Sequence, residues 1–478
     1  MNSKLLLIVL ALVLLTATPG HTQQTETFDY WQYNRALIAR GVQALSMCHG
    51  LYESNRTLEQ VFRDELAYLP DPIGTADGGD YVVDAQQRSV AVGTDDGVPV
   101  MRAVHRHGVG CMTLAPDQGF DAIDSLPRID LAPPPGDPAT IPWPDGDRLE
   151  PTALPATVDA AALQAASDWA FERESPEQLT LSLIVVYRGQ IIHERYANGV
   201  DATTRTRTWS TAKSIAATLI GMAVEDGLLA LDEPIDVDWL PEASEPMLDP
   251  RNTITLRHVL NMSSGLVPVD NNRLEYATGS GLAYWAGASS ARLLRSGALI
   301  RKPGTHWDYE NLDTLRAIYA LRRALASTEK YHTFARQRLL DKIGMRSTVL
   351  GMDRFGDFIL SSQVYTNARD LARFGLLYAN GGVWNGERLI AESWIDFVRT
   401  PAPALAERGN YYGGQFWLVP DDRKNDVPAD AYATAGNRGQ YVIIAPSHDL
   451  VIVRRGLDFG KQGFDRWSLL REVVRAFE

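Results

Sequence analysis

Several features that would place this chain in a familiar class are missing from its sequence. Basic residues are too few for a nucleic-acid surface, because 46 lysines and arginines stand against 59 aspartates and glutamates. No run beyond residue 15 is long and apolar enough to span a bilayer. The G-x-S-x-G pattern of α/β-hydrolases and the H-E-x-x-H pattern of zinc proteases are also absent. We therefore expect no nucleic-acid partner, no stable membrane anchor and neither of those two enzyme classes.

Cysteine is scarce, and Cys48 and Cys111 are the only two in the chain. In an oxidising compartment such a pair forms a disulfide, which is the state we expect. Two free, buried thiols are the alternative. The cysteines also form a group with His49, His105 and His107 that could bind a metal. Their spacing matches no established zinc pattern, so we expect no metal site.

The first residues have the three parts of a secretory signal. Lys4 precedes an uninterrupted apolar run over residues 5–15, and small or polar residues follow as far as Thr22. Such a run is too short to cross a bilayer. The sequence predicts a signal peptide over residues 1–22, cleaved after Gly20 or Thr22, and hence a periplasmic or secreted protein. An uncleaved N-terminal anchor is the alternative.

Proline content divides the rest of the chain. Residues 131–147 contain six prolines and two glycines, a composition typical of extended backbone in a linker or a surface strap. We take 131–149 as a Pro-rich linker between an N-terminal region of unknown role, 23–130, and a larger unit, 150–478. In the N-terminal region we expect helices over 31–47 and 58–69 and strands over 81–83, 89–92 and 98–104.

Both ends of the larger unit have the pattern of strands. Runs rich in β-branched residues at 181–187 and 190–196 flank a hairpin turn, and similar runs at 440–445 and 450–455 precede a final helix. A long, mostly helical middle separates the two ends. This order predicts an α+β fold in which both ends of the unit build one antiparallel sheet, flanked by helices, with a helical lobe inserted between them.

The strongest chemical signal is the S-x-x-K pattern formed by Ser210 and Lys213, which opens a predicted helix. A helix N-terminus favours negative charge, which helps a serine that must become an alkoxide. Lys213 follows one turn later on the same face, where a half-buried amine can lose its charge or keep another base deprotonated. A nucleophilic serine needs such a base. A serine that only caps the helix is the alternative.

A second pattern, Y-x-N, is formed by Tyr309 and Asn311. Residues two apart in an extended segment point the same way, so the phenol and the amide would share one side. A phenol beside an ammonium group has a lowered proton affinity and can act as a base, and an amide can bind a substrate carbonyl. A buried tyrosine next to an asparagine turn is the alternative.

A third, glycine-rich segment covers residues 434–440, before a predicted strand. Glycine there lets a substrate approach the backbone closely. Its amides, at Gly436 and Asn437, could complete an oxyanion hole with the amide of Ser210. A plain β-turn is the alternative.

Taken together, these three patterns resemble the penicillin-recognising serine hydrolases, the serine β-lactamase and penicillin-binding-like family. The resemblance is closest to its class C branch, which includes esterases, D-aminopeptidases, D,D-carboxypeptidases and 6-aminohexanoate-dimer hydrolases. It covers roughly residues 180–475, with the motifs in family order. Four further segments support it: 223–235, 254–266, 366–377 and 439–446.

The resemblance implies a β-lactamase/D,D-peptidase-like fold and acyl transfer that requires no metal or organic cofactor. Ser210 would attack a carbonyl while Lys213 and Tyr309 share the proton transfers. The implied catalytic residues are Ser210, Lys213 and Tyr309, and the implied substrate-binding residues are Asn311, Gly436 and Asn437.

One departure from the family bears on the substrate. Family members that bind β-lactams usually carry Lys-Thr-Gly on the third strand, or His in place of that Lys. The matching residues here are 434–436 or 437–439, and we favour 434–436 because Gln440 then begins the next strand after a short turn. Neither begins with Lys or His, and Arg438 would supply its charge from a different place. We therefore expect weak or no β-lactamase activity.

The leading hypothesis is an exported serine hydrolase that cleaves a small ester or amide. A cell-wall D,D-peptidase or β-lactamase is the enzymatic alternative, and a non-catalytic binding homologue is the other. The sequence leaves open the substrate itself, the oligomeric state and the role of residues 23–130, which could narrow the mouth of the site or contact a partner.

Overall fold

The computed structural model describes residues 31–477, with the exception of 95, 152 and 271–278. The expected signal peptide lies outside these residues. Within them, no helix has the length and apolar character needed to cross a membrane.

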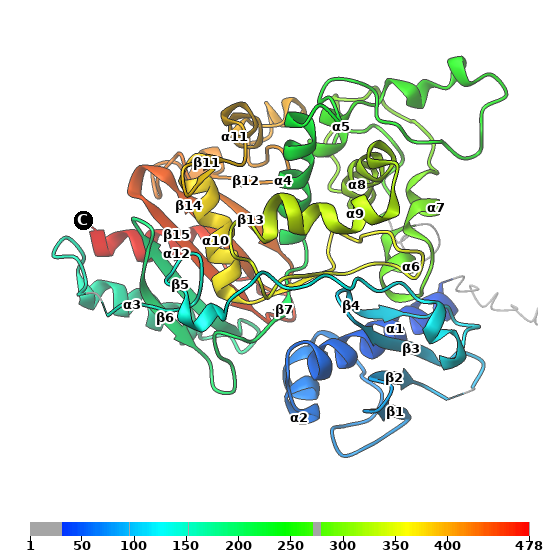
Figure 1. Ribbon diagram of the computed structural model, residues 1–478, viewed down its shortest axis with the longest axis horizontal. Helices are drawn as coiled ribbons and strands as arrows, with labels where there is room; N and C mark the ends of the chain where they lie inside the picture. The colour runs from blue at the N-terminus through cyan, green and yellow to red at the C-terminus, as the bar shows by residue number, and fades with distance from the viewer. Residues whose placement is uncertain (1–30, 95, 152, 271–278, 478) are drawn as a thin grey trace, which may run out of the picture.

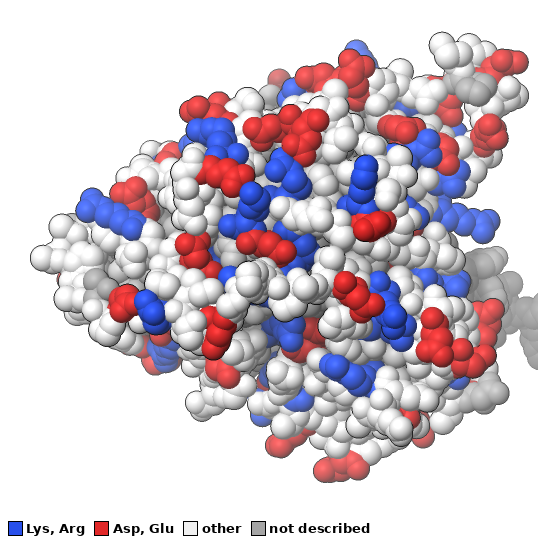
Figure 2. Space-filling view, viewed as in Figure 1, with Lys and Arg blue, Asp and Glu red and all other residues white. Residues whose placement is uncertain are grey.

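Acidic and basic side chains are interspersed over the face seen in Figure 2, so neither sign dominates that face.

A six-stranded antiparallel sheet with the order β12-β13-β14-β15-β5-β6 forms the centre of the larger unit (Figure 1). Strand β15, near the end of the chain, pairs with β5, with Leu450 opposite Tyr187. The two ends of the unit therefore meet inside one sheet, which confirms the predicted α+β fold. The strands are β5 Thr180–Tyr187, β6 Gln190–Tyr196, β12 Trp417–Leu418, β13 Tyr432–Gly436, β14 Gln440–Ala445 and β15 Leu450–Gly456.

Helices cover both faces of this sheet, and strand residues alternate between two apolar cores. Val185 and Ile443 face one core, and their neighbours Ile184 and Val442 face the other. Because both faces are buried, β5 and β14 are buried at every position. The first core contains α3 Ala160–Phe171 and α12 Arg466–Val474, and the second contains α4 Thr211–Glu225 and α10 Ala368–Ala379.

The helical lobe is inserted between β6 and β12. Its longest helix, α8, packs against α4, so the lobe lies directly beside the start of the central helix. Two small sheets, β7-β9-β8 and β10-β11, complete this part. The helices are α5 Leu256–Leu260, α6 Ser280–Trp285, α7 Ser290–Leu294, α8 Asn311–Leu325, α9 Thr328–Ala335 and α11 Glu392–Arg399, and the strands are β7 Thr206–Arg207, β8 Val349–Leu350, β9 Val364–Thr366, β10 Val383–Trp384 and β11 Glu387–Arg388.

The N-terminal region packs one long helix, α1, across a four-stranded antiparallel sheet. Its fourth strand was not predicted, because it has only four residues and begins with Gly110. The elements are α1 Gln32–Tyr52, α2 Leu58–Gln60, β1 Tyr81–Asp84, β2 Ser89–Val92, β3 Met101–Arg106 and β4 Gly110–Thr113.

The expected helical segment over 58–69 is confirmed in extent, but its turns are of three different kinds. After α2 the chain winds into a π-helical turn, Val61–Glu65, and then a 3-10 turn, Leu66–Tyr68. The backbone carbonyls of Asp64 and Glu65 accept hydrogen bonds from the Arg438 side chain of the larger unit. These two carbonyls thus connect the helical segment to the larger unit.

A disulfide joins Cys48 of α1 to Cys111 of β4, with the Cα atoms 6.0 Å apart. This confirms the expected pairing and leaves neither thiol to bind a metal. Among the described residues, no group of three or more His, Cys, Asp or Glu side chains is arranged to hold a metal ion.

Residues of the Pro-rich linker form a strap over the larger unit. The buried guanidinium of Arg373, on α10, donates to the carbonyls of Pro144 and Gly146 and to the carboxylate of Asp147. Trp384 donates to Asp145 in the same stretch. Beyond the strap, the apolar core continues without a break from α1 into the larger unit. The two parts are therefore packed as one body.

Candidate active site

Ser210 lies where β7 turns into α4. Trp209, just before it, has a φ of 50°, and this left-handed backbone directs the chain sharply into the helix. Ser210 is the N-cap residue of α4, yet its side chain makes no capping hydrogen bond. Its hydroxyl is therefore available for chemistry, at a helix start that favours negative charge.

Lys213 is fully buried one turn into α4. Its Nζ lies 3.2 Å from Ser210 Oγ, 2.5 Å from Asn311 Oδ1 and 2.8 Å from the carbonyl oxygen of Ser361. Burial lowers the pKa of Lys213 to about 7, although the negative charge of Asp270 acts against this shift. Much of this amine is therefore neutral at neutral pH and able to accept a proton.

Tyr309 completes a triangle with Ser210 and Lys213. The Nζ of Lys213 lies 4.9 Å from the centroid of the phenol ring, and the phenol hydrogen-bonds to Ser210. The lowered proton affinity expected for this phenol was wrong. Burial raises the pKa of Tyr309 well above its usual value, and the Ser210 hydrogen bond and the charge of Arg466 only partly oppose it. Tyr309 therefore holds its proton in the resting site.

Asn311, the first residue of α8, holds Lys213 in place. Its Oδ1 accepts from Lys213, its Nδ2 donates to Ser280 Oγ at 3.0 Å, and its backbone N–H donates to Asp270 Oδ2 at 2.8 Å. The amide is thus part of a fixed hydrogen-bond network beneath Ser210. This use of Asn311 was not predicted from the sequence.

The third segment has the register that was favoured from the sequence. Strand β13 ends at Gly436, which pairs with Gln440 at the start of β14, so Thr434 to Gly436 are on the strand and residues 437–439 form the turn. A Cβ atom at Gly436 would lie 2.1 Å from the carbonyl oxygen of Thr208 and 3.1 Å from the nitrogen of Ser210. The strand end therefore touches the backbone at Thr208 and Ser210, and only glycine fits there.

Arg438, in that turn, has its guanidinium bonded to the backbone of the N-terminal region and of the segment after β15. It is buried and donates to the carbonyls of Asp64, Glu65, Leu457 and Asp458. With its donors occupied by backbone, Arg438 cannot serve as the cation that the family places at the first position of this segment. Asn437, beside it, is exposed.

Two acidic residues beneath the site were missed. Asp270 accepts from Asn311 and from both the backbone and the hydroxyl of Ser280. Burial and the neighbouring charge of Asp270 raise the pKa of Glu310 to about 9, so this carboxyl is protonated at neutral pH. Asp270 belongs to no motif, and only tertiary packing brings it to the site.

An aromatic cluster with one cation flanks Tyr309 on its other side. The ring of Trp417 lies 5.6 Å from that of Tyr309, and the guanidinium of Arg466 lies 5.1 Å from the Trp417 ring. Trp307 and Tyr412 also pack against Tyr309. Arg466, at the start of α12, was not singled out from the sequence, because it is far from every motif along the chain.

A family model described as Beta-lactamase matches residues 170–455, more than half of the chain. The chain belongs to the beta-lactamase family. It is therefore a serine hydrolase, and the resemblance noted from its motifs is confirmed. Residues 31–169, including the N-terminal region and the strap, lie outside the matched segment.

Individual relatives agree with this membership. The 6-aminohexanoate-dimer hydrolase of Paenarthrobacter ureafaciens is 23% identical over 305 residues, which are 59% of this chain and 74% of that protein. A family VIII carboxylesterase structure matches with a TM-score of 0.50 and 16% identity, over 69% of this chain and 98% of that one. A penicillin-binding protein homologue from Caulobacter crescentus gives a TM-score of 0.52 and 18% identity, over 69% and 99%. The two structures confirm the fold.

Proposed function

We propose that this protein is an exported serine hydrolase that cleaves ester or amide bonds through an acyl-enzyme on Ser210. The observation that carries the proposal is the contact between Ser210 Oγ and the buried Nζ of Lys213, whose pKa is lowered to about 7. A neutral amine next to a hydroxyl is the arrangement that activates a weak nucleophile. Export is supported by the signal-like N-terminus and by the disulfide.

The proposed reaction has two steps. Lys213, with Tyr309 as a relay, takes the proton of Ser210 as Oγ attacks the carbonyl carbon. The N–H groups of Ser210 and Asn437 stabilise the negative oxygen. Tyr309 then donates a proton to the leaving alcohol or amine as its bond to the carbonyl breaks. Water, activated by the same groups, attacks the acyl-enzyme and releases the acid, which restores Ser210.

The proposed substrate is a small ester or amide that is not a β-lactam. The relative from Paenarthrobacter ureafaciens is named for hydrolysis of a 6-aminohexanoate dimer, and one structural neighbour is a carboxylesterase. The first residue of the third segment is Thr434, and Arg438 is fully engaged with backbone carbonyls. A carboxylate anchor of the usual kind is therefore missing from this position.

Labelling with a fluorophosphonate, followed by intact mass and peptide mapping, tests the proposal. We expect one adduct, on Ser210, and loss of p-nitrophenyl ester turnover in Ser210→Ala. Ser447→Ala is the matched control, because Ser447 is exposed at the opposite end of β14. Absence of both adduct and turnover would contradict the proposal and favour a binding homologue. Stoichiometric inhibition by penicillin would favour the D,D-peptidase alternative.

A further inference from the structure

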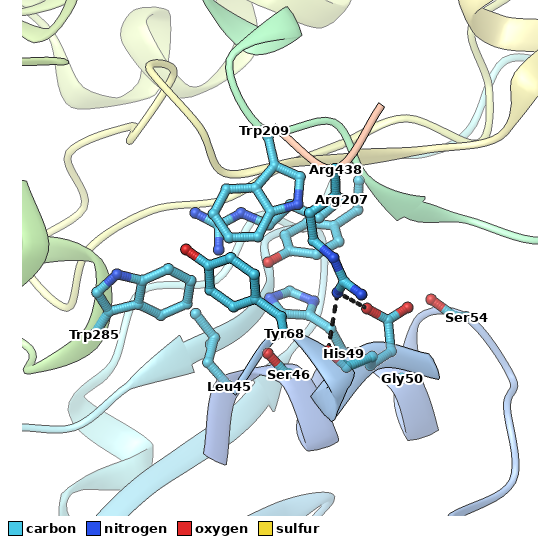
Figure 3. A pocket seen from close by; sticks show the side chains of 12 residues that line it. Leu45, Ser46, His49, Gly50, Ser54, Tyr68, Arg207, Trp209, Trp285 and Arg438 are labelled. Carbon is cyan, nitrogen blue, oxygen red and sulfur yellow. Dashed lines mark hydrogen bonds and ion pairs between the residues drawn. The ribbon is translucent and has the colours of Figure 1, made fainter. Parts of the chain in front are cut away.

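Tyr68, a side chain of the N-terminal region, contacts the residue that directly precedes Ser210. The 3-10 turn Leu66–Tyr68 places the Tyr68 ring 5.5 Å from the ring of Trp209, the residue directly before Ser210 (Figure 3). Despite this contact, Tyr68 keeps 41% of its surface exposed. The exposed part of the Tyr68 ring can therefore contact a molecule that is bound near Ser210.

Tyr68 also contacts a residue of the turn between β13 and β14. The guanidinium of Arg438 lies 5.5 Å from the centroid of the Tyr68 ring. Arg438 directly follows Asn437, the proposed second donor to the oxyanion. It also ties down the backbone just before Tyr68, through the carbonyls of Asp64 and Glu65. The Tyr68 ring thus contacts both Trp209, which precedes Ser210, and Arg438, which follows Asn437.

The rings behind Tyr68 are packed and cannot admit a ligand. Arg207 stacks 3.9 Å from the centroid of Trp209 and 4.3 Å from that of Trp285, and the two indole rings lie 6.1 Å apart. The cavity enclosed behind Tyr68 and Trp209 has a volume of about 20 Å³, which holds no more than a water molecule. A substrate group can therefore reach only the outer side of these rings.

We propose that Tyr68 and Trp209 form a subsite for an aryl group without positive charge next to the scissile bond. This inference rests on the proposed function, because it deepens the specificity of that same site. Flat rings offer a stacking surface that suits another ring. The guanidinium groups of Arg207 and Arg438, close to the two rings, disfavour a positively charged group. Tyr68 is then a specificity-determining residue supplied from outside the matched family segment.

The test compares aryl and alkyl ligands on the purified full-length protein. One pair is phenylboronic acid and butylboronic acid, as inhibitors that bond to Ser210 with their group on the acyl side. The other is phenyl acetate and butyl acetate, as substrates that differ on the leaving side. The aryl-to-alkyl ratio is the affinity for the aryl compound divided by the affinity for the alkyl compound, each taken from an inhibition constant or a KM. Each variant's ratio is compared only with the wild-type ratio, so the intrinsic reactivity of each compound cancels.

We expect Tyr68→Ala to lower the aryl-to-alkyl affinity ratio about fivefold to tenfold in at least one pair. The change should come from a higher inhibition constant or KM for the aryl compound, with kcat unchanged. Tyr68→Phe should retain the wild-type ratio, and Tyr68→Leu should lose it although it keeps an apolar contact with Trp209. Tyr33→Ala is the matched control, since Tyr33 is a similarly exposed tyrosine, 49%, in the same region.

The outcomes separate this inference from the proposed function. If the wild-type enzyme is active and Tyr68→Ala and Tyr68→Leu have the same aryl-to-alkyl ratios as wild type, the subsite alone is overturned. A wild-type protein that neither hydrolyses the acetates nor forms the Ser210 fluorophosphonate adduct would overturn the proposed function. Equal loss for aryl and alkyl compounds would show that Tyr68 only supports the fold, and would overturn the subsite as well.

Discussion

The N-terminal region and the larger unit are packed as one body but are specified by the sequence in different ways. In the larger unit, Ser210 and Lys213 are three residues apart on one helix, so their spacing alone predicts their contact. In the N-terminal region, Tyr68 reaches Trp209 from far along the chain, and no spacing indicates it. The comparison teaches that short spacing along the chain predicts the contact between Ser210 and Lys213. The contact of Tyr68 with Trp209, beside them, depends on tertiary packing.

The largest effect is expected from a substitution of Lys213, whose contact with Ser210 the sequence predicts. Lys213→Met removes the base beside Ser210 while keeping an unbranched apolar side chain in a fully buried position. We expect kcat/KM for a p-nitrophenyl ester to fall by about a thousandfold in a variant that still folds. Lys302→Met, at an exposed lysine of the same lobe, should leave activity unchanged. A Lys213→Met variant that keeps more than a tenth of wild-type activity would contradict the assignment.

Breaking the disulfide tests how the N-terminal region is held. Cys48 and Cys111 are 63 residues apart, and opening a loop of that length costs about 4 kcal/mol of stability by the chain-entropy relation. Cys48→Ser/Cys111→Ser should therefore melt at a markedly lower temperature, while the folded variant still labels at Ser210. Wild type in reductant should follow the variant. Equal melting temperatures with and without the bridge would be evidence against this.

Arg438→Ala tests the connection between the two regions. The change leaves the carbonyls of Asp64 and Glu65 without their donor, so we expect a loss of about 2–4 kcal/mol in the free energy of unfolding. Arg408→Ala, at an exposed arginine, is the control. Denaturant unfolding measures both. A stability change in Arg438→Ala no larger than in the control would disprove the anchoring role.

The smallest expected effect is a shift in pH dependence. With the pKa of Lys213 near 7, kcat/KM should be low in acid and rise through about pH 7 as the amine loses its proton. Asp270→Asn removes a negative charge that favours the ammonium form, so the rise should move to lower pH. Glu329→Gln, at an exposed glutamate of the same lobe, is the control, because its charge is not among those that act on Lys213. Identical profiles for all three proteins would rule out Lys213 as the titrating base.

The sequence was sufficient for features that depend on short spacing. These include the contact of Ser210 with Lys213, the register in which Gly436 ends a strand and Gln440 begins the next, and a sheet that joins both ends of the larger unit. The disulfide was also predictable, because only one pairing of two cysteines exists. Periodicity and turn residues determine each of these features locally.

The sequence was insufficient wherever burial or long-range contact decides the outcome. The proton affinity of Tyr309 was predicted with the wrong sign, because the cost of burying a charged phenol exceeds the effect of neighbouring groups. The hydrogen bonds from Arg438 to the carbonyls of Asp64 and Glu65 join residues more than 350 positions apart. Asp270 supports Asn311 from a part of the chain without a motif. None of these leaves a pattern in the sequence.

The central claim is that Ser210 becomes acylated, and trapping that intermediate tests it most directly. Wild-type protein is mixed with p-nitrophenyl acetate, quenched in acid within the first turnover, and measured by intact mass and peptide mapping. The account predicts the mass of one added acetyl group, on the peptide containing Ser210, together with a burst of p-nitrophenol that Lys213→Met lacks. Turnover without any acylated Ser210, or acetyl groups on another residue that follow the turnover rate, would contradict it.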